Sequence, residues 1–176
     1  MQTAHECQPG PVQLRPLRED DREMIVRLLT DEVVGRTYMV PDGIDRPMAE
    51  KIFLRYLERG ADSARYVQAI CAGETPVGVI HDVGIENGTV ELGWALISDY
   101  HGKGFCTEAV RLAIGELRSL GYQAVTAGAF ADNLPSLRVM EKNGMKPIAF
   151  EEIIPYKGKD RLCVYRSLDL GESDDG

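Results

Sequence analysis

The stretch from Glu91 to Val110, ELGWALISDYHGKGFCTEAV, limits the folds open to this chain more than any other. Its first half is rich in apolar residues and predicts a strand. Two glycines then flank Lys103, and beyond them apolar residues recur at helical intervals up to Leu120, with Gly121 placed to end the helix. The sequence therefore predicts a strand, a glycine loop and a helix in direct succession.

Two familiar phosphate-binding motifs do not match this glycine loop. A Walker P-loop needs Ser or Thr after Gly-Lys, but Gly104 follows Lys103, and no glycine stands at the required upstream position. A dinucleotide fingerprint needs a third glycine where Thr107 stands. Uncovered backbone N–H groups and the positive end of the following helix still favour an anion such as a phosphate. A tight turn without a ligand is the alternative.

Length and composition fit one globular domain. The chain has 176 residues, with 44% hydrophobic and 27% charged residues, and its apolar runs fall short of the roughly 20 residues that span a bilayer. We expect a flexible leader at 1–11, a single domain at 12–169 and a disordered acidic tail at 170–176. The first residues lack a basic start and an apolar stretch, so we expect a cytoplasmic protein that does not bind membranes.

Charge and cysteine spacing argue against two further classes of site. A formal net charge of −8 disfavours nucleic acid, which is bound through clustered Lys and Arg, and weakly favours cationic partners such as amines. The four cysteines are widely scattered, without a CxxC pair or a zinc-like His spacing. We therefore expect reduced thiols and no metal.

The order of elements predicts an α/β chain in its middle and an α+β chain overall. A first strand, VQLRPL, precedes a helix around Met24 to Leu29 and a second helix from Met48 to Arg59. Between the helices lies GRTYMVPDGIDR, from Gly35 to Arg46, a loop long enough to line a site.

Strands make up most of the remaining chain. ARYVQAICAG, PVGVIHDVGI and TVELGWALIS read as three antiparallel strands, with Asn87-Gly88 as a hairpin turn. YQAVTAGAF follows the predicted helix as a parallel strand. Asn133 then caps a short helix that ends near Gly144, and MKPIAFEEII and KDRLCVYRSL form a closing hairpin.

Two motifs at a suitable separation resemble those of the GNAT N-acetyltransferases. His101 to Cys106 is similar to that family's pyrophosphate loop, Gln/Arg-x-x-Gly-x-Gly/Ala, with His101 and Cys106 departing from the pattern. NLPSLRVMEKNGM, from Asn133 to Met145, is similar to the N-x-x-S-x-x-V-x-x-K-x-G-F segment of the branch that contains ribosomal-protein N-terminal acetyltransferases. Glu91 to Ala109 resembles the same branch. The resemblance covers nearly the whole chain.

The resemblance implies the GNAT acyl-CoA fold, a mixed sheet of about seven strands with about four helices, and acetyl-CoA as co-substrate. In the family, two central strands splay apart and the pantetheine arm binds in the gap. Carried over, the cofactor-binding residues are Leu96, Ile97, His101, Gly102, Lys103, Gly104, Phe105, Cys106, Thr107 and Asn133. His101 can still donate to a phosphate oxygen through either ring nitrogen. Asn133 serves as a helix cap, a cofactor contact or both.

Acetyl transfer to an amine needs a neutral nucleophile, a polarised carbonyl and a proton for the leaving thiolate. The resemblance points to Glu91 as the base, to a backbone N–H near Leu96 as the polariser and to Ser136 as the acid. The helix after Asn133 lacks the tyrosine that many relatives use. Tyr156 is a second candidate acid, and a solvent-facing role for Glu91 stays open.

The acceptor site is the part of the protein that one sequence constrains least. Gly35 to Arg46 and Pro155 to Lys159 are expected to frame it, and His81 or Asp82 is a candidate to point into it. The predicted activity is N-acetylation of a protein N-terminus or a small amine by direct transfer in a ternary complex. Another acyl-CoA as donor, a non-catalytic acyl-CoA-binding role and a homodimer all stay open.

Overall fold

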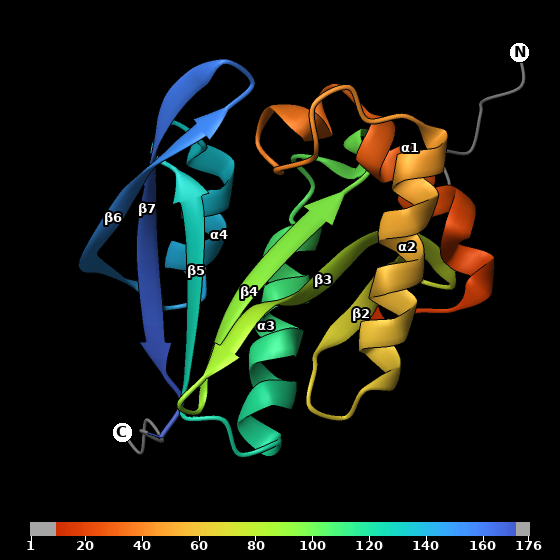
Figure 1. The fold of residues 1–176 in the computed structure, drawn as a ribbon. Helices are drawn as coiled ribbons and strands as arrows, with labels where there is room; N and C mark the ends of the chain where they lie inside the picture. The colour runs from red at the N-terminus through yellow and green to blue at the C-terminus, as the bar shows by residue number, and fades with distance from the viewer. Residues whose placement is uncertain (1–9, 172–176) are drawn as a thin grey trace, which may run out of the picture.

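The computed structural model describes residues 10–171, which form one seven-stranded mixed sheet (Figure 1). The strand order across the sheet is β1-β2-β3-β4-β5-β7-β6. The strands are β1 (Val12–Pro16), β2 (Val67–Ala72), β3 (Thr75–Glu86), β4 (Thr89–Leu96), β5 (Ala124–Phe130), β6 (Lys146–Tyr156) and β7 (Lys159–Asp169). The expected mixed sheet of about seven strands is confirmed.

Four α-helices in the same part of the chain cover the sheet: α1 (Arg22–Thr30), α2 (Arg46–Ala61), α3 (Phe105–Ser119) and α4 (Leu134–Lys142). Single 3-10 turns stand at Glu19–Asp21, Val34–Arg36 and Ser98–Tyr100. Helices α1 and α2 pack on one face of β2 and β3, whereas α3 and α4 lie behind the sheet in Figure 1. Helix α2 begins two residues earlier than expected, because Asp45 accepts a hydrogen bond from the Met48 N–H and Pro47 is tolerated in the first turn.

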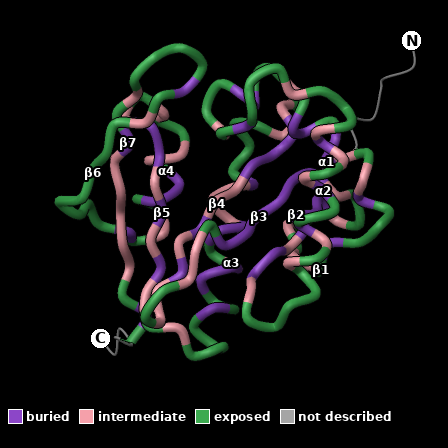
Figure 2. The backbone as a smooth tube through the Cα atoms, viewed as in Figure 1, coloured by how far each residue is buried: buried purple, intermediate pink, exposed green. Residues whose placement is uncertain are grey.

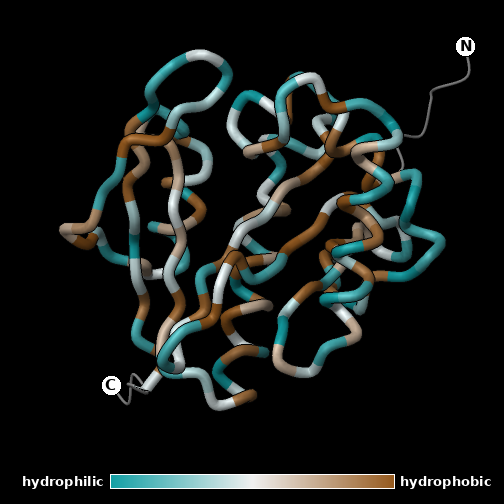
Figure 3. The backbone as a smooth tube through the Cα atoms, in the orientation of Figure 1, coloured by the Kyte–Doolittle hydropathy of each residue, from teal (hydrophilic) through white to brown (hydrophobic). Residues whose placement is uncertain are grey.

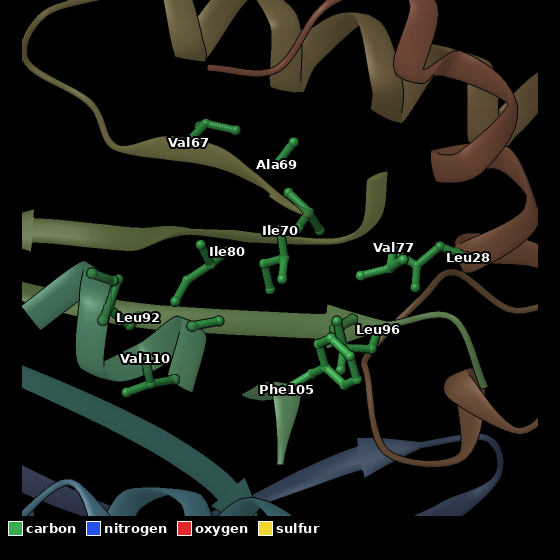
Figure 4. Packing of buried hydrophobic residues seen from close by; sticks show 14 of the residues in the cluster. Leu28, Val67, Ala69, Ile70, Val77, Ile80, Leu92, Leu96, Phe105 and Val110 are labelled. Carbon is green, nitrogen blue, oxygen red and sulfur yellow. The ribbon is translucent and has the colours of Figure 1, made fainter. Parts of the chain in front are cut away.

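The core lies mainly between the sheet and its helices under β2, β3 and β4. Buried backbone in Figure 2 coincides there with apolar sequence in Figure 3. Figure 4 shows Ile80, Leu92 and Val110 meeting between β3, β4 and α3, and Phe105 beside Leu96 at the base of the glycine loop. Burial of this apolar area is what holds the loop and helix α3 against the end of β4.

The sheet opens between its two central strands. β4 pairs with β5 in parallel from Thr89–Glu91 to Ala124–Thr126, and the two strands then diverge (Figure 1). On the far side of the gap, β5 stays paired with β7 along Ala124–Phe130. The second half of β4 is therefore paired with β3 alone, and its edge toward β5 has no strand partner within residues 10–171.

The turns and the ends of the domain follow from local chemistry. Asn87 and Gly88 adopt positive φ angles of 49° and 76°, as the hairpin signal predicts. The expected leader (1–11) and tail (170–176) lie largely outside the described residues. Leu170 is buried and its N–H donates to the Gln123 carbonyl, so the packed domain extends to Leu170.

Two further observations concern residues 10–171 alone. Within them, no helix combines the length and apolarity that a membrane crossing requires. The same residues contain no group of three or more His, Cys, Asp or Glu side chains placed to hold a metal ion.

Candidate active site

A cavity of about 600 Å³ lies where β4 and β5 separate. Its walls come from four stretches of the chain, within residues 33–38, 94–96, 100–107 and 132–142. These are the loop after α1, the free end of β4, the glycine loop with the first turn of α3, and α4 with the turn before it. Elements far apart in sequence therefore converge on one hollow.

The glycine loop presents the start of helix α3 to this cavity. Gly102 and Gly104 have φ angles of 71° and 81°, in the left-handed region that glycine adopts without strain, and Gly104 is the N-terminal cap. The first intrahelical hydrogen bond at this end runs from the Glu108 N–H to the Gly104 carbonyl. The amides of Phe105, Cys106 and Thr107 precede that bond and are left to a ligand. Together with the positive end of the helix dipole, these amides form a site that favours an anion.

Most of the predicted site residues meet at this cavity. Nine of the twelve line it: Leu96, His101, Gly102, Gly104, Phe105, Cys106, Thr107, Asn133 and Ser136. Three do not, namely Glu91, Ile97 and Lys103. Whether the nine contact a bound coenzyme stays a prediction.

The backbone of Ile97 does not suit its expected contact with a pantetheine arm. Its N–H donates to the Val77 carbonyl at 2.9 Å, and its carbonyl accepts from the Tyr100 N–H at 3.0 Å. Along a strand, the N–H and C=O of one residue point to one side and those of the next residue point to the other side. Because the N–H of Ile97 points toward β3, those of Leu96 and Trp94 point toward the gap. The backbone N–H groups of Leu96 and Trp94 are therefore the ones left free toward the gap, and that of Ile97 is not.

Lys103 lies apart from the cavity wall. Its ammonium is 5.8 Å from the centroid of the Tyr100 ring, which is a cation–π geometry. The part that this loop contributes to the cavity wall is therefore that of its other residues and not the lysine side chain.

His101 is already bonded within the protein. Its Nε2 lies 2.8 Å from the Leu96 carbonyl oxygen, which can only accept, so Nε2 carries the hydrogen. In the neutral ring, Nδ1 is then an acceptor and cannot donate to a phosphate. The expectation that either nitrogen could donate is therefore wrong, and only the protonated ring has a donor to spare.

Cys106 forms an apolar part of the cavity wall. Burial raises the pKa of its thiol to about 12, so the thiol stays neutral and unreactive at physiological pH. Cys106 stands at the last position of the pyrophosphate-loop pattern, where the family has Gly or Ala, and it adds no charge there.

Asn133 and Ser136 are bound to each other at the start of α4. The Asn133 side-chain oxygen accepts from the Ser136 N–H at 3.4 Å, and the Asn133 Nδ2 donates to the Ser136 Oγ at 3.1 Å. The capping role of Asn133 is thus confirmed. The Ser136 Oγ is the acceptor in its bond with Asn133, so the hydrogen of the hydroxyl is not used in that bond. It can be donated to a group in the cavity.

Glu91 lies at the apex of the gap, as the last β4 residue paired with β5. It lines a separate hollow of about 540 Å³ together with Thr126 and residues of the hairpin at 84–89. Burial, with a smaller contribution from the nearby Glu152 carboxylate, raises the pKa of Glu91. Its side chain therefore lies at the junction of the two strands and not in the wall of the large cavity.

Tyr156 is held by the loop that follows α1. Its hydroxyl donates to the Gly35 carbonyl at 2.5 Å, lies 3.2 Å from the Tyr38 carbonyl, and accepts from the Val40 N–H at 3.3 Å. The side chain is buried and lies outside the cavity wall. These bonds fix the loop and leave this hydroxyl poorly placed to protonate a leaving group.

The sequence analysis expected the loop from Gly35 to Arg46 to frame the acceptor site, but it did not single out Tyr38 in that loop or the positive charges of the cavity. Tyr38, from the long loop after α1, lines the wall beside Trp94. Arg36, Arg138 and Lys142 also line it, against a single carboxylate, Asp132, which pairs with Arg161 at 2.7 Å. For Tyr38, the sequence feature that pointed to a site was the unusual length of the loop from Gly35 to Arg46. The spacing of Arg138 and Lys142, four residues apart on one helix face, was the signal for those two.

Asp82 has a structural role, which removes it as a candidate for the acceptor site. It is fully buried, its carboxylate pairs with Arg59 and Arg65, and it accepts from the Tyr66 N–H at 2.8 Å. These contacts join the end of α2 to the start of β2.

Comparison with known families agrees with this geometry. The family model described as "Acetyltransferase (GNAT) domain" matches residues 12–146. No curated protein matches the chain by sequence.

Solved structures with the same fold cover nearly the whole chain. An acetyltransferase of the GNAT family from Bacillus anthracis has a TM-score of 0.76 at 21% identity, covering 94% of this chain and 98% of that one. A microcin C7 self-immunity acetyltransferase in complex with acetyl-CoA and AMP gives 0.79 at 16%, covering 90% and 92%. Spermidine N-acetyltransferase from Vibrio cholerae, in complex with CoA and spermine, gives 0.77 at 14%, covering 90% and 95%. At these identities the similarity establishes the fold.

Proposed function

The chain belongs to the GNAT family of acetyltransferases, and we propose that it moves the acetyl group of acetyl-CoA to a primary amine by direct transfer in a ternary complex. The observation that carries the proposal is the cavity at the gap between β4 and β5, which joins a helix N-terminus to unpaired strand backbone. A pyrophosphate and an amide-containing arm need these two features side by side.

The cofactor would be held by backbone at one end and by side chains at the other. The amides of residues 104–107 suit a pyrophosphate, and Arg138 and Lys142 supply positive charge on the neighbouring face of α4. The Leu96 N–H points into the gap and suits either the arm or the thioester oxygen. His101 would steady this end of β4 through its bond to the Leu96 carbonyl.

The chemistry divides among three groups of the chain. The Leu96 N–H would polarise the thioester carbonyl, because a donor aimed at the developing oxyanion stabilises the transition state. Ser136 would donate its free hydroxyl hydrogen to the departing sulfur. Glu91 would attract the cationic acceptor to the junction and accept its proton through water, and its raised pKa suits a base working near neutral pH.

The acceptor class is the least constrained part of the proposal. A protein N-terminus is favoured by the resemblance of residues 91–109 and 133–145 to the ribosomal-protein branch. A small amine is favoured by the acidic net charge of −8, which attracts cations. We place the acceptor between the β4–β5 junction, where Glu91 lies, and the loop after α1, where Tyr38 and Arg36 line the wall of the cavity.

A panel assay tests the proposed function. The protein is incubated with acetyl-CoA and a set of N-terminal peptides and small amines, and the release of free thiol is followed. Acceptor-dependent turnover supports the proposal. Tight acetyl-CoA binding without turnover on any acceptor would favour a non-catalytic binding protein, and faster turnover with a longer acyl-CoA would reassign the donor.

A thermal shift tests cofactor binding by itself. A ligand at 100 times its dissociation constant adds roughly 2.7 kcal/mol to the free energy of unfolding. Saturating CoA should therefore raise the melting temperature by several degrees. An unchanged melting temperature would contradict the assignment of the cavity.

A further inference from the structure

We propose that Tyr38 and His81, supported by Tyr56, form a proton relay that carries the proton of the acceptor amine out of the cavity. This inference rests on the proposed function and adds a catalytic residue, Tyr38, and a positioning residue, His81. It starts from a buried histidine with an unassigned role. Glu91 is proposed to take the proton of the cationic acceptor before attack, whereas the relay takes the second proton, which the nitrogen loses as it bonds to the thioester carbon.

Three side chains from three elements meet behind β4. The Tyr38 hydroxyl lies 2.7 Å from the His81 Nε2 and 2.6 Å from the Tyr56 hydroxyl. Tyr38 comes from the loop after α1, Tyr56 from α2 and His81 from β3. Tyr38 lines the cavity, whereas His81 is only 7% exposed, so the contact runs from the cavity wall into the core.

The tautomer of His81 follows from its other ring nitrogen. Nδ1 lies 3.0 Å from the Asp82 carbonyl oxygen, which can only accept, so Nδ1 carries the hydrogen. In the neutral ring Nε2 is then an acceptor, and it takes the hydrogen of the Tyr38 hydroxyl at 2.7 Å in preference to that of the Tyr56 hydroxyl, which lies 3.5 Å away. The Tyr56 hydroxyl donates to Tyr38 in turn. One lone pair of the Tyr38 oxygen is left for a proton that arrives from the cavity.

The relay is close to the expected reaction centre and is held rigidly. His81 packs against Gly93 of β4, where an added Cβ would come within 3.4 Å of the imidazole. Gly93 lies in the unpaired part of β4, next to Trp94 of the cavity wall. The Tyr156 hydroxyl binds the loop backbone at Gly35, Tyr38 and Val40, which fixes the position of Tyr38.

The charges around His81 favour its neutral form. Burial lowers the pKa of His81, the backbone contact with Asp82 opposes this shift, and Arg59 of α2 adds to it. The Asp82 carboxylate is itself neutralised by Arg59 and by Arg65 of the segment before β2. Burial also raises the pKa of Tyr38 and of Tyr56, so both keep their hydrogens at physiological pH.

The proton balance of the step is as follows. As the amine nitrogen bonds to the thioester carbon, its proton passes to the Tyr38 oxygen while the Tyr38 hydrogen passes to the His81 Nε2. The imidazolium is stabilised through its Nδ1–H bond to the Asp82 carbonyl. When the carbon–sulfur bond breaks, the thiolate takes a proton from Ser136 or water, and His81 returns its proton along the same path to the cavity, where it replaces the proton that Ser136 or water gave up. Amine and thioester become amide and thiol.

Steady-state kinetics of Tyr38→Phe and His81→Gln test the relay, with acetyl-CoA and the best N-terminal peptide of the panel. Each change should lower kcat about 100-fold at pH 7 while leaving the KM for acetyl-CoA unchanged, since proton transfer typically contributes about 10²- to 10⁴-fold. The double variant should be no slower than either single one, because the two residues act as a unit. Tyr66→Phe is the matched control: its buried hydroxyl bonds Glu116, away from the cavity, and its kcat should be unchanged.

The pH dependence separates a relay from a packing defect. The relay needs a neutral His81 ring to accept the Tyr38 hydrogen, so the wild-type protein should itself lose the relay as the pH falls through the lowered pKa of His81. The rate deficit of both variants should therefore shrink as the pH is lowered, and it should persist at about pH 9.5, because a neutral amine still loses a proton when it bonds to the carbon. A deficit that stays equal as the pH is lowered, or losses that multiply in the double variant, would overturn the relay.

Imidazole NMR tests the geometry without turnover. The chain has three histidines, so the His81 signals can be assigned by comparison with His81→Gln. The expected result is a protonated Nδ1 and an unprotonated Nε2 whose shift changes in Tyr38→Phe. A proton on Nε2 would overturn the proposal. Full activity in both variants would contradict the relay alone, whereas a wild-type protein without turnover on any acceptor would contradict the proposed function.

Discussion

At the scale of single residues, Glu91 combines a stability cost with a proposed function. Its raised pKa means that the folded protein prefers the protonated form, so the ionised carboxylate costs stability above its unfolded pKa. That cost disappears as the pH falls through the folded pKa. Side chains that destabilise the fold are commonly retained where activity needs them.

Glu91→Gln should therefore be more stable than the wild-type protein at pH 7 and should lose most of its turnover. The stability gain should be small, because the side chain is only partly buried, and it should vanish near pH 4, where Glu91 is protonated. Thermal melts at the two pH values and the thiol-release assay measure both effects. Unchanged turnover would assign Glu91 to the solvent-facing role that its strand position also allows.

Asp82 is a residue whose loss should affect folding rather than chemistry. Asp82→Asn leaves Arg59 and Arg65 facing a neutral side chain in a buried site, which should cost about 3 kcal/mol. Asp99→Asn is the control, because its pair with Arg27 is exposed and should contribute less than about 1 kcal/mol. Urea denaturation of both variants compares them. Equal losses would contradict the structural role of Asp82.

At the scale of elements, the sequence predicted the order of strands and helices because each has a strong local signal. The Asn87-Gly88 turn, the Asn133 cap and the Gly104 start of α3 all form where expected. Contacts between distant segments could not be predicted this way. The bond from His101 to the Leu96 carbonyl and the contact of Tyr38 with His81 depend on tertiary packing, which periodicity does not encode.

Helix α3 offers a matched pair of glycine substitutions. Gly104→Ala should cost about 1–2 kcal/mol, because φ is 81° there, although an added Cβ meets no atom within 4 Å. Gly115→Ala, in an exposed part of the same helix and equally free of clashes, should stabilise by about 0.5–1 kcal/mol. Thermal melts and CoA titrations of both should show weaker CoA binding only for Gly104→Ala. Equal effects would mean that the loop conformation is not required.

At the scale of the whole molecule, the fold collects positive charge in a chain whose net charge is −8. The cavity brings Arg36, Arg138 and Lys142 to one wall, while most of the acidic residues lie elsewhere on the surface. Such a local field attracts a polyanion to the cavity even though the protein as a whole repels it. CoA affinity should therefore depend on these few cations and on ionic strength.

Lys142→Ala should weaken CoA binding about 3- to 10-fold at low salt, because an exposed charge contact contributes roughly 1 kcal/mol. The difference from wild type should shrink at 1 M salt, where the Debye length is about 3 Å. Lys146→Ala removes an equal charge from exposed β6, outside the cavity, and should leave binding unchanged. Titration calorimetry at two salt concentrations makes the comparison. If both variants weaken binding equally, CoA affinity responds to the total charge of the protein, and the cations of the cavity have no special role.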